Sequence, residues 1–277
     1  MSAPMTTWFT ADLHFGHANI IRYCSRPFAD VDDMNRQLIE RWNENVATDD
    51  TVWVLGDVAM GVISESLPLV GQLAGHKRLL AGNHDRCWGG HGPRAEAWID
   101  RYLDAGFSTI HQDEITLTVG AKSALACHFP YHGDSQEEPR YLHHRPTDLG
   151  DWLLHGHVHD TWKQNGRMIN VGTDVWNFRP VNESELALRM NLIEIDGSRF
   201  DTIGGFYDEI SQQLIGGADW GRNLDAFNDV LRGGFGTPEN GFVLRWIASD
   251  RSRRQLDQFD TILEIITDHD DVTLELW

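Results

Sequence analysis

Five short apolar runs in the first 185 residues each carry Asp, Asn or His at or just past the carboxyl end, and this repeated ending constrains the fold more than any other feature. The runs are TTWFTADLH, TVWVLGDV, HKRLLAGNHD, SALACHFP and DWLLHGHVH. Helical patterns lie between them, because the apolar residues of segments 31–46 and 95–103 each fall on one helix face. Alternating strands and helices predict a layered α/β domain, with ligands gathered at the carboxyl ends of its strands.

The composition excludes several classes of protein. The 277 residues carry 23 Lys and Arg against 42 Asp and Glu, a formal net charge of −19, which argues against a protein that coats duplex nucleic acid. An apolar fraction of 41% supplies a core, and three cysteines are too few for a disulfide scaffold. No apolar run approaches the roughly 18 residues of a membrane helix. The first residues lack the features of a signal peptide, so we expect a cytoplasmic protein without a membrane partner.

The polar endings form one set of oxygen and imidazole ligands without a thiolate. In chain order they are Asp12, His14, Asp57, Asn83, His84, Asp85, His128, His157 and His159. Residues i and i+2 of a strand share a face, so the Asp-x-His and His-x-His pairs each point to one side. One such motif alone is usually a turn or a cap. Their joint occurrence at strand ends instead favours a site for a divalent metal such as Mn²⁺, Fe or Zn²⁺.

The order DLH, GDV, GNHD, HFP and GHVH resembles the calcineurin-like metallophosphoesterases, in particular a branch of small enzymes that opens with D-x-H-F-G-H. The resemblance covers residues 6–180 and implies a β-sandwich flanked by helices, with two divalent metal ions. Mn²⁺ is the first expectation for these ions, and Fe, Zn²⁺ and Ni²⁺ stay open. The implied first metal is held by Asp12, His14 and His159, the bridge is Asp57, and the second metal is held by Asn83, His128 and His157. The resemblance also implies that His84 is an acid outside the set of metal ligands, and that Asp85 orients it.

The implied reaction is the hydrolysis of a phosphomonoester or a phosphodiester, with a cyclic nucleotide among the candidates. Two metals about 3.5–4 Å apart lower the pKa of a shared water, and the resulting hydroxide attacks phosphorus in line. Four further residues are candidates for contact with the substrate: His17, Arg26, Arg86 and His132. A role at the entry of a helix is the alternative for His17.

A second module begins near Arg189, and we expect domains at residues 1–185 and 189–277 with a junction in Pro180–Leu186. Its patterns predict the order β-α-α-β-α-β, from RMNLIEI through FYDEISQQL, NLDAFNDVL, FVLRWIA and QFDTILEIITDH to VTLELW. The element order and the segment DWGRNLDAFND resemble barstar, the intracellular inhibitor of barnase-type ribonucleases. The resemblance implies a small α/β domain with a three-stranded parallel sheet.

In barstar, an aromatic–Gly–x–Asn loop and two acids face the ribonuclease, and four residues occupy these positions here: Trp220, Asn223, Asp225 and Asp229. Residues 189–277 carry eight arginines, no lysine and seventeen acids, a net charge of −9 that suits a basic partner. A solvated helix face is the alternative interpretation of the two acids. The sequence therefore predicts a metal-dependent phosphoesterase with a protein-binding module. The alternative is an immunity or antitoxin protein that sequesters a basic ribonuclease and has phosphoesterase activity as a secondary property.

Overall fold

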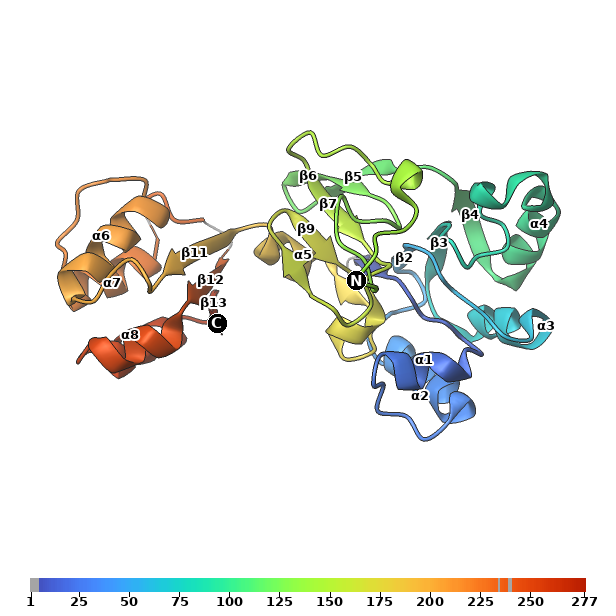
Figure 1. Cartoon of the computed structure of the whole chain (residues 1–277), viewed down its shortest axis with the longest axis horizontal. Helices are drawn as coiled ribbons and strands as arrows, with labels where there is room; N and C mark the ends of the chain where they lie inside the picture. The colour runs from blue at the N-terminus through green and yellow to red at the C-terminus, as the bar shows by residue number, and fades with distance from the viewer. Residues whose placement is uncertain (1–4, 234, 239–240) are drawn as a thin grey trace. The chain divides into compact units, whose positions relative to one another are not determined.

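A computed structural model describes residues 5–233, 235–238 and 241–277. The chain divides into two compact units, Met1–Leu186 and Ala187–Trp277, which are coloured from blue to yellow and from orange to red in Figure 1. Among the described residues, no helix is both long and apolar enough to cross a bilayer.

The described residues of the first unit form two five-stranded sheets. The first has the order β10-β1-β2-β3-β4, with β1 to β4 parallel and β10 antiparallel to β1. The second has the order β5-β6-β7-β9-β8, in which β7 runs parallel to β6 and β9. The strands are β1 (Thr7–Thr10), β2 (Thr51–Val54), β3 (His76–Leu80), β4 (Phe107–His111), β5 (Ile115–Val119), β6 (Lys122–Ala126), β7 (Trp152–His155), β8 (Gln164–Asn165), β9 (Met168–Asn170) and β10 (Val181–Asn182).

This arrangement confirms the predicted β-sandwich flanked by helices. Each of the five apolar runs contains a strand, namely β1, β2, β3, β6 and β7. The patterns did not predict β4, β5, β8, β9 and β10, which are short or half-exposed. The predicted junction, Pro180–Leu186, folds into β10 and the first part of α5, and the boundary between the units follows Leu186.

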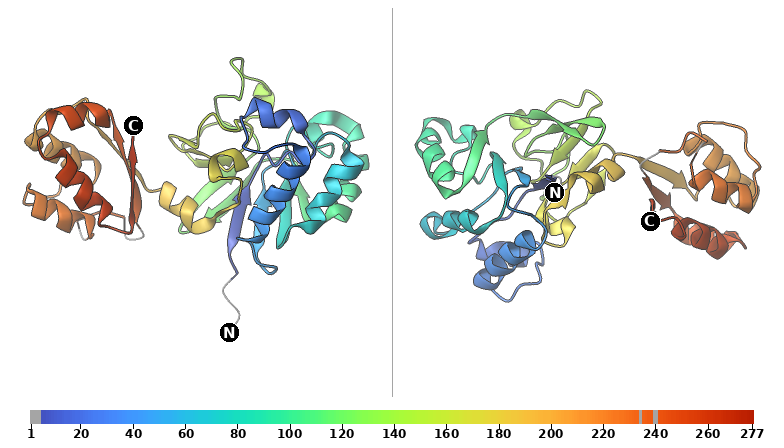
Figure 2. Two further views of the ribbon diagram at one scale, coloured as in Figure 1. Left: turned by 90° about the horizontal axis from the view of Figure 1, so that it is seen from below. Right: turned by 180° about the vertical axis from the view of Figure 1, so that it is seen from behind.

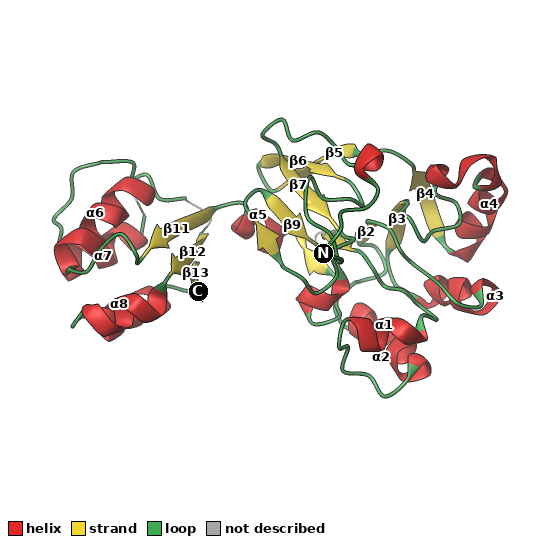
Figure 3. Cartoon of the chain, viewed as in Figure 1, coloured by secondary structure: helices red, strands yellow, loops and turns green. Residues whose placement is uncertain are grey.

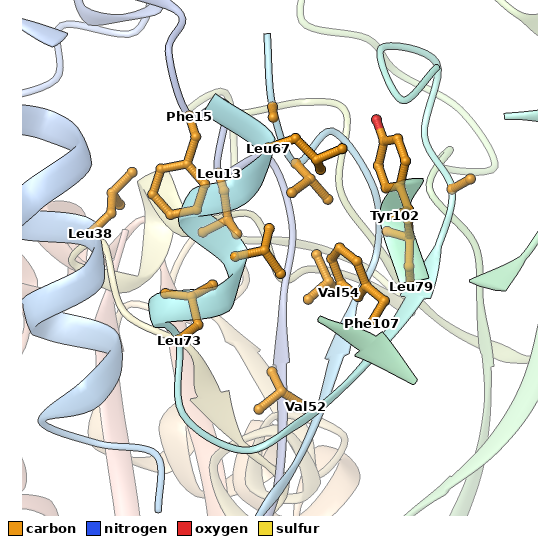
Figure 4. Packing of buried hydrophobic residues seen from close by; sticks show 14 of the residues in the cluster. Leu13, Phe15, Leu38, Val52, Val54, Leu67, Leu73, Leu79, Tyr102 and Phe107 are labelled. Atoms are coloured by element: carbon orange, nitrogen blue, oxygen red, sulfur yellow. The ribbon is translucent and has the colours of Figure 1, made fainter. Parts of the chain in front are cut away.

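Helices cover one face of the first sheet (Figure 3). These helices are α1 (Ala18–Tyr23), α2 (Val31–Asn43), α3 (Ile63–Ser66) and α4 (Glu96–Ala105), whereas α5 (Glu183–Arg189) follows β10. The 3₁₀ helices are Leu67–Gln72, Gly89–Arg94, Leu142–His144 and Thr173–Trp176. The carboxylate of Asp30 caps α2 by accepting a hydrogen bond from the Asp33 amide. Leu38 of α2 packs with Val52 and Val54 of β2 in one apolar cluster (Figure 4), so periodic burial holds this helix on the sheet.

The parallel strands bring the predicted ligands to one edge. The carboxyl ends of β1, β2 and β3 meet side by side, because these strands pair in parallel with close register. Asp12 follows β1, Asp57 follows β2, and Asn83 follows β3. The second sheet contributes the loops after β6 and β7, which carry His128 and His157.

The described residues of the second unit form a three-stranded parallel sheet of order β11-β12-β13, as predicted. Its strands are β11 (Leu192–Asp196), β12 (Phe242–Ile247) and β13 (Val272–Leu276), and its helices are α6 (Ile203–Gln213), α7 (Leu224–Leu231), α8 (Ser249–Gln255) and α9 (Phe259–Thr267). Phe206 of α6, Phe227 of α7 and Ile262 of α9 share an apolar cluster with Trp246 of β12, and Figure 2 shows these helices beside the sheet. The sequence patterns missed α8, which is mostly polar.

Candidate metal centre

The first group of ligands comes from three strand ends that lie far apart in the sequence. Asp12, His14, Asp57 and His159 each offer one ligand atom, and these atoms all lie within 4.8 Å of one another. The Nε2 atom of His14 is 3.8 Å from Oδ2 of Asp57, and Nε2 of His159 is 3.7 Å from Oδ1 of Asp12. All but His159 are buried.

The second group surrounds the amide oxygen of Asn83. This oxygen lies 3.1 Å from Nε2 of His128 and 3.1 Å from Nδ1 of His157. Nε2 of His128 is also 3.5 Å from Oδ2 of Asp57. The Asp57 carboxylate therefore lies within 4 Å of an imidazole nitrogen from each group, in the position that a shared ligand would occupy.

The donors in the first group suit a divalent cation. Oδ1 of Asp12 is buried and has no hydrogen-bond partner among the described residues, and burial raises the pKa of this carboxyl to about 8. Burial lowers the pKa of His14 well below its ordinary value and that of His159 to about 3, so both rings are neutral. Neutral imidazoles bind metals, and a buried carboxylate without a partner needs a positive charge.

Asp57 and His128 of the second group shift each other's pKa in opposite directions. Burial lowers the pKa of His128, but the adjacent Asp57 carboxylate outweighs burial and raises the value to about 9. Burial raises the pKa of Asp57, and the charges of His128 and His14 outweigh it, so the net pKa is well below the ordinary value. Asp57 is therefore ionised at neutral pH.

Backbone strain is concentrated at the ligands. Five of the seven proposed metal ligands have a left-handed φ, with 56° at Asp12, 54° at His14, 58° at Asp57, 71° at His157 and 50° at His159. For a residue with a Cβ atom this conformation costs about 1–2 kcal/mol. Such strain persists only where the surroundings enforce it, and it is typical of functional sites.

Two glycines leave room for the carboxylates. A Cβ atom on Gly82 would lie 2.5 Å from Oδ1 of Asp57, and one on Gly156 would lie 2.6 Å from Oδ2 of Asp12. Both distances are far shorter than a van der Waals contact. Any side chain at either position would displace a ligand.

The Asp85 carboxylate binds backbone amides of two loops of the site. Its buried carboxylate accepts hydrogen bonds from the backbone amides of Asp57 (2.8 Å), Val58 (3.0 Å) and Gly82 (2.9 Å). None of the hydrogen bonds that the described residues give Asp85 reaches the His84 ring. Asp85 therefore links the loop after β2 to the loop after β3, and the expectation that it orients His84 stays a prediction. Nε2 of His84 instead lies 4.0 Å from Oδ2 of Asp57, with 38% of the side chain exposed.

Arg26 is a buried support and does not reach the substrate cavity, so its predicted role as a substrate contact is wrong. Its guanidinium donates two hydrogen bonds of 2.8 Å to the carboxylate of Asp174. The remaining donors bind the carbonyl oxygens of Asp12 and Leu13. The side chain is fully buried, and it holds the strained segment after β1 in place.

Asp134 is a functional residue that the sequence patterns missed. It lies in the irregular segment between β6 and the 3₁₀ helix Leu142–His144, and its Oδ2 atom is 3.1 Å from Nε2 of the ligand His157. Arg140 and Arg145 also donate to this carboxylate. Burial raises the pKa of Asp134, and the hydrogen bonds from His157 and Arg140 outweigh it, so the net pKa is far below the ordinary value. A lone Gly-Asp pair in a loop was the only sequence signal.

A cavity of about 470 Å³ opens over the metal-site residues. Besides ligands it is lined by His17 and His84, both predicted near the substrate, and by Ser135, Gln136 and Arg140 from the Asp134 segment. His132 is exposed and does not line this cavity. Arg86 lines an adjoining cavity that also contains His84.

The four predicted contacts in the second unit separate into a core residue, a cap and two exposed acids. Trp220 is buried against Tyr207 and donates from Nε1 to Oγ of Ser211 at 2.8 Å, and its contact with a ribonuclease stays a prediction. Asn223 caps α7 by accepting a hydrogen bond from the Ala226 amide. Asp225 and Asp229 are exposed on α7.

Comparisons with known proteins found a family for the second unit and relatives of the chain. A sequence model of the family Barstar (barnase inhibitor) matches residues 190–274, which confirms the resemblance of the second module. The Gene 66 protein of Mycobacterium phage D29 is 38% identical over 180 residues, covering 61% of this chain and 88% of that protein. The Gene 66 protein of Mycobacterium phage L5 is 34% identical over 198 residues, covering 65% and 91%.

One solved structure resembles the first unit. The protein of unknown function AQ665 from Aquifex aeolicus superposes with a TM-score of 0.51 at 23% identity, over 66% of this chain and 98% of that one. This likeness concerns the fold. The first unit thus shares its fold with AQ665, and it carries a buried His/Asp cluster suited to a metal ion.

Proposed function

The chain belongs to the family of the Gene 66 proteins of mycobacteriophages D29 and L5, and we propose that its first unit is a metal-dependent phosphoesterase. The observation that carries this proposal is the position of Asp57, whose Oδ2 atom lies 3.8 Å from His14 and 3.5 Å from His128. One carboxylate thereby belongs to two groups of ligands. Such an arrangement serves a pair of metal ions that act on one phosphoester.

Bound divalent ions would supply Lewis-acid stabilisation of negative charge on the phosphoryl oxygens. Asp12, His14 and His159 would hold one ion, Asn83, His128 and His157 the other, with Asp57 shared. His84 is partly exposed beside this site, so it can donate a hydrogen bond to a phosphoryl oxygen or a proton to the departing alkoxide. Mn²⁺ is the ion that we propose first, because the donors are oxygen and nitrogen without thiolate.

The test replaces the shared carboxylate. We expect Asp57→Ala to lose more than about 10³-fold of the Mn²⁺-dependent hydrolysis of bis-p-nitrophenyl phosphate, since both groups lose a ligand at once. Metal analysis should show the loss of at least one ion. Asp49→Ala, which removes an exposed acid from a loop of the same unit, is the matched control. Full activity in Asp57→Ala contradicts the proposed site.

We propose that the barstar domain binds a basic, ribonuclease-like protein. The domain carries a net charge of −9, and α7 presents Asp225 and Asp229 to solvent. Opposite charge steers such partners together. Asp229 lies 3.5 Å from Arg232, but with 63% of its side chain exposed this pair leaves the carboxylate open to a partner.

The full chain tests this binding and the alternative function together. Calorimetry with a basic microbial ribonuclease should show an affinity that falls with salt and falls again in Asp229→Ala. If the chain acts chiefly as an antitoxin, the Asp57→Ala variant should inhibit the ribonuclease as well as the wild type does. If inhibition requires phosphoester hydrolysis, this variant should not inhibit. The absence of any binding contradicts the proposed partner and leaves the phosphoesterase proposal standing.

A further inference from the structure

A second cavity, of about 390 Å³, adjoins the one over the metal site. The two cavities share Met60 and His84 among their lining residues. The second cavity is lined by residues from the loop after β2, the loop after β3 and the start of α4. A molecule bound at the metal site therefore reaches this cavity by passing His84.

The second cavity is lined by basic side chains, whereas the chain as a whole has a negative net charge. Its lining includes Arg86, Arg94, His84 and His91 and no Asp or Glu among the described residues. The cavity over the metal site, in contrast, is lined by two acids, Asp57 and Asp160. In a chain of net charge −19, a cavity whose charged lining residues are two arginines attracts anions.

The two arginines are available to a ligand. Both side chains are exposed, and the part of the chain that the structure describes gives neither guanidinium an ion pair. The guanidinium of Arg86 lies 5.0 Å from the centre of the Trp98 ring. Stacking on an aromatic ring orients a guanidinium and leaves its planar edge free for a phosphate oxygen pair. Arg94 comes from the neighbouring 3₁₀ helix, Gly89–Arg94.

We propose that this second cavity binds a phosphate group on the departing half of the substrate. The substrate is then a small phosphoester that carries a second phosphate, with the reacting phosphate at the metal site and the other between Arg86 and Arg94. The volume suits part of a small molecule, and Ile63 and Trp98 provide an apolar wall for the group that joins the phosphates. This inference rests on the proposed phosphoesterase function, because the metal site defines which phosphate reacts.

The test measures the binding of adenosine 3′,5′-bisphosphate and of adenosine 3′-monophosphate to the Mn²⁺-loaded full chain by calorimetry. The wild type should prefer the bisphosphate, and Arg86→Ala and Arg94→Ala should each lower this preference by about 10–100-fold, which is the effect of a lost charge-assisted hydrogen bond. Arg101→Ala is the matched control. Its guanidinium lies 4.5 Å from the same Trp98 ring but does not line this cavity, so the preference should persist.

Equal affinities of the wild type for the two nucleotides overturn the inference. So does a preference that survives the double variant with both arginines replaced, or one that Arg101→Ala removes equally. Hydrolysis of bis-p-nitrophenyl phosphate, measured in parallel, reports separately on the proposed function. A chain that hydrolyses this compound without preferring the bisphosphate keeps its phosphoesterase function and loses only the second-phosphate cavity. Circular dichroism of each variant checks that it is folded.

Discussion

The buried carboxylate of Asp12 in the first unit and the buried guanidinium of Arg245 in the second differ in whether side chains of the protein pair with them. In the first unit, Oδ1 of Asp12 is buried without a hydrogen-bond partner among the described residues, and the neighbouring ligands have strained backbones. In the second unit, the buried Arg245 is paired with Glu275 at 3.0 Å and with Glu194 at 3.5 Å. Burying a charge costs free energy unless a partner offsets it. The Asp12 carboxylate of the first unit therefore calls for a cation, whereas Arg245 of the second unit is balanced by two acids of its own sheet.

The largest expected effect is on the chemistry of the first unit. His84→Ala should retain its metals and lose about 10²–10⁴-fold in rate if the ring is a general acid. The loss should be smaller for an ester of p-nitrophenol, because p-nitrophenolate leaves without a proton. Steady-state rates on aryl and alkyl esters, with metal analysis, measure both quantities. An equal loss on all esters indicates stabilisation of the phosphoryl oxygens, and loss of metal would make His84 a ligand.

The next effect concerns the apolar core of the second unit. Phe227→Ala should lower the free energy of unfolding of this unit by about 3–5 kcal/mol, because Phe227 is fully buried and its removal leaves a cavity. Phosphoester hydrolysis at 25 °C should persist, since the apolar clusters of the two units share no described residue. Hydrogen exchange of peptides from β12 and β13 reports the first quantity. A simultaneous loss of hydrolysis would show that the units depend on one another.

Asp134 tests how the metal site is supported. Asp134→Asn should lower the affinity for Mn²⁺ by about 10–100-fold, because the carboxylate that fixes the His157 ring loses its charge. Calorimetric titration of the metal-free protein measures this directly, without reference to turnover. Asp148→Asn, at an exposed ion pair with Arg167, is the control. Unchanged metal affinity in Asp134→Asn would reduce this residue to an anchor for Arg140 and Arg145.

The smallest effect is a pH-dependent one in the second unit. Burial raises the pKa of Glu275, but the charges of Arg189 and Arg245 outweigh it, and the net pKa lies below the ordinary value of 4.5. A carboxyl group whose pKa is lowered by folding stabilises the folded unit at pH values above its ordinary pKa. This stabilisation is lost as the pH falls through the lowered pKa. Glu275→Gln should thus destabilise the unit by about 1 kcal/mol or less at pH 7. The difference from the wild type should shrink below pH 4.5, as hydrogen exchange of β13 can show. A difference that is constant with pH contradicts this account.

Local patterns were sufficient to predict the strands that carry ligands and the three amphipathic helices of the second unit, α6, α7 and α9. TTWFT and TVWV contain β1 and β2 because short runs of buried β-branched and aromatic residues suit the strands of a parallel sheet. The side chains that follow these strands must meet, since parallel strands end at one edge. Asp12 and Asp57 are therefore neighbours for a reason that the sequence contains. The ranges of β8 and β10, two residues each, are too short for any periodic pattern to show.

Which partner each polar side chain takes was decided only by the tertiary structure. Arg26 binds Asp174, 148 residues away, and Asp85 binds backbone amides of another strand's loop. Asp134 reaches His157 from a segment without regular structure. Sequence alone determined the kinds of ligand and the order of the elements, because these depend on residue chemistry and on periods of a few residues. It could not determine these pairings, because the partners are 23 to 148 residues apart and only the packing of the elements brings them together.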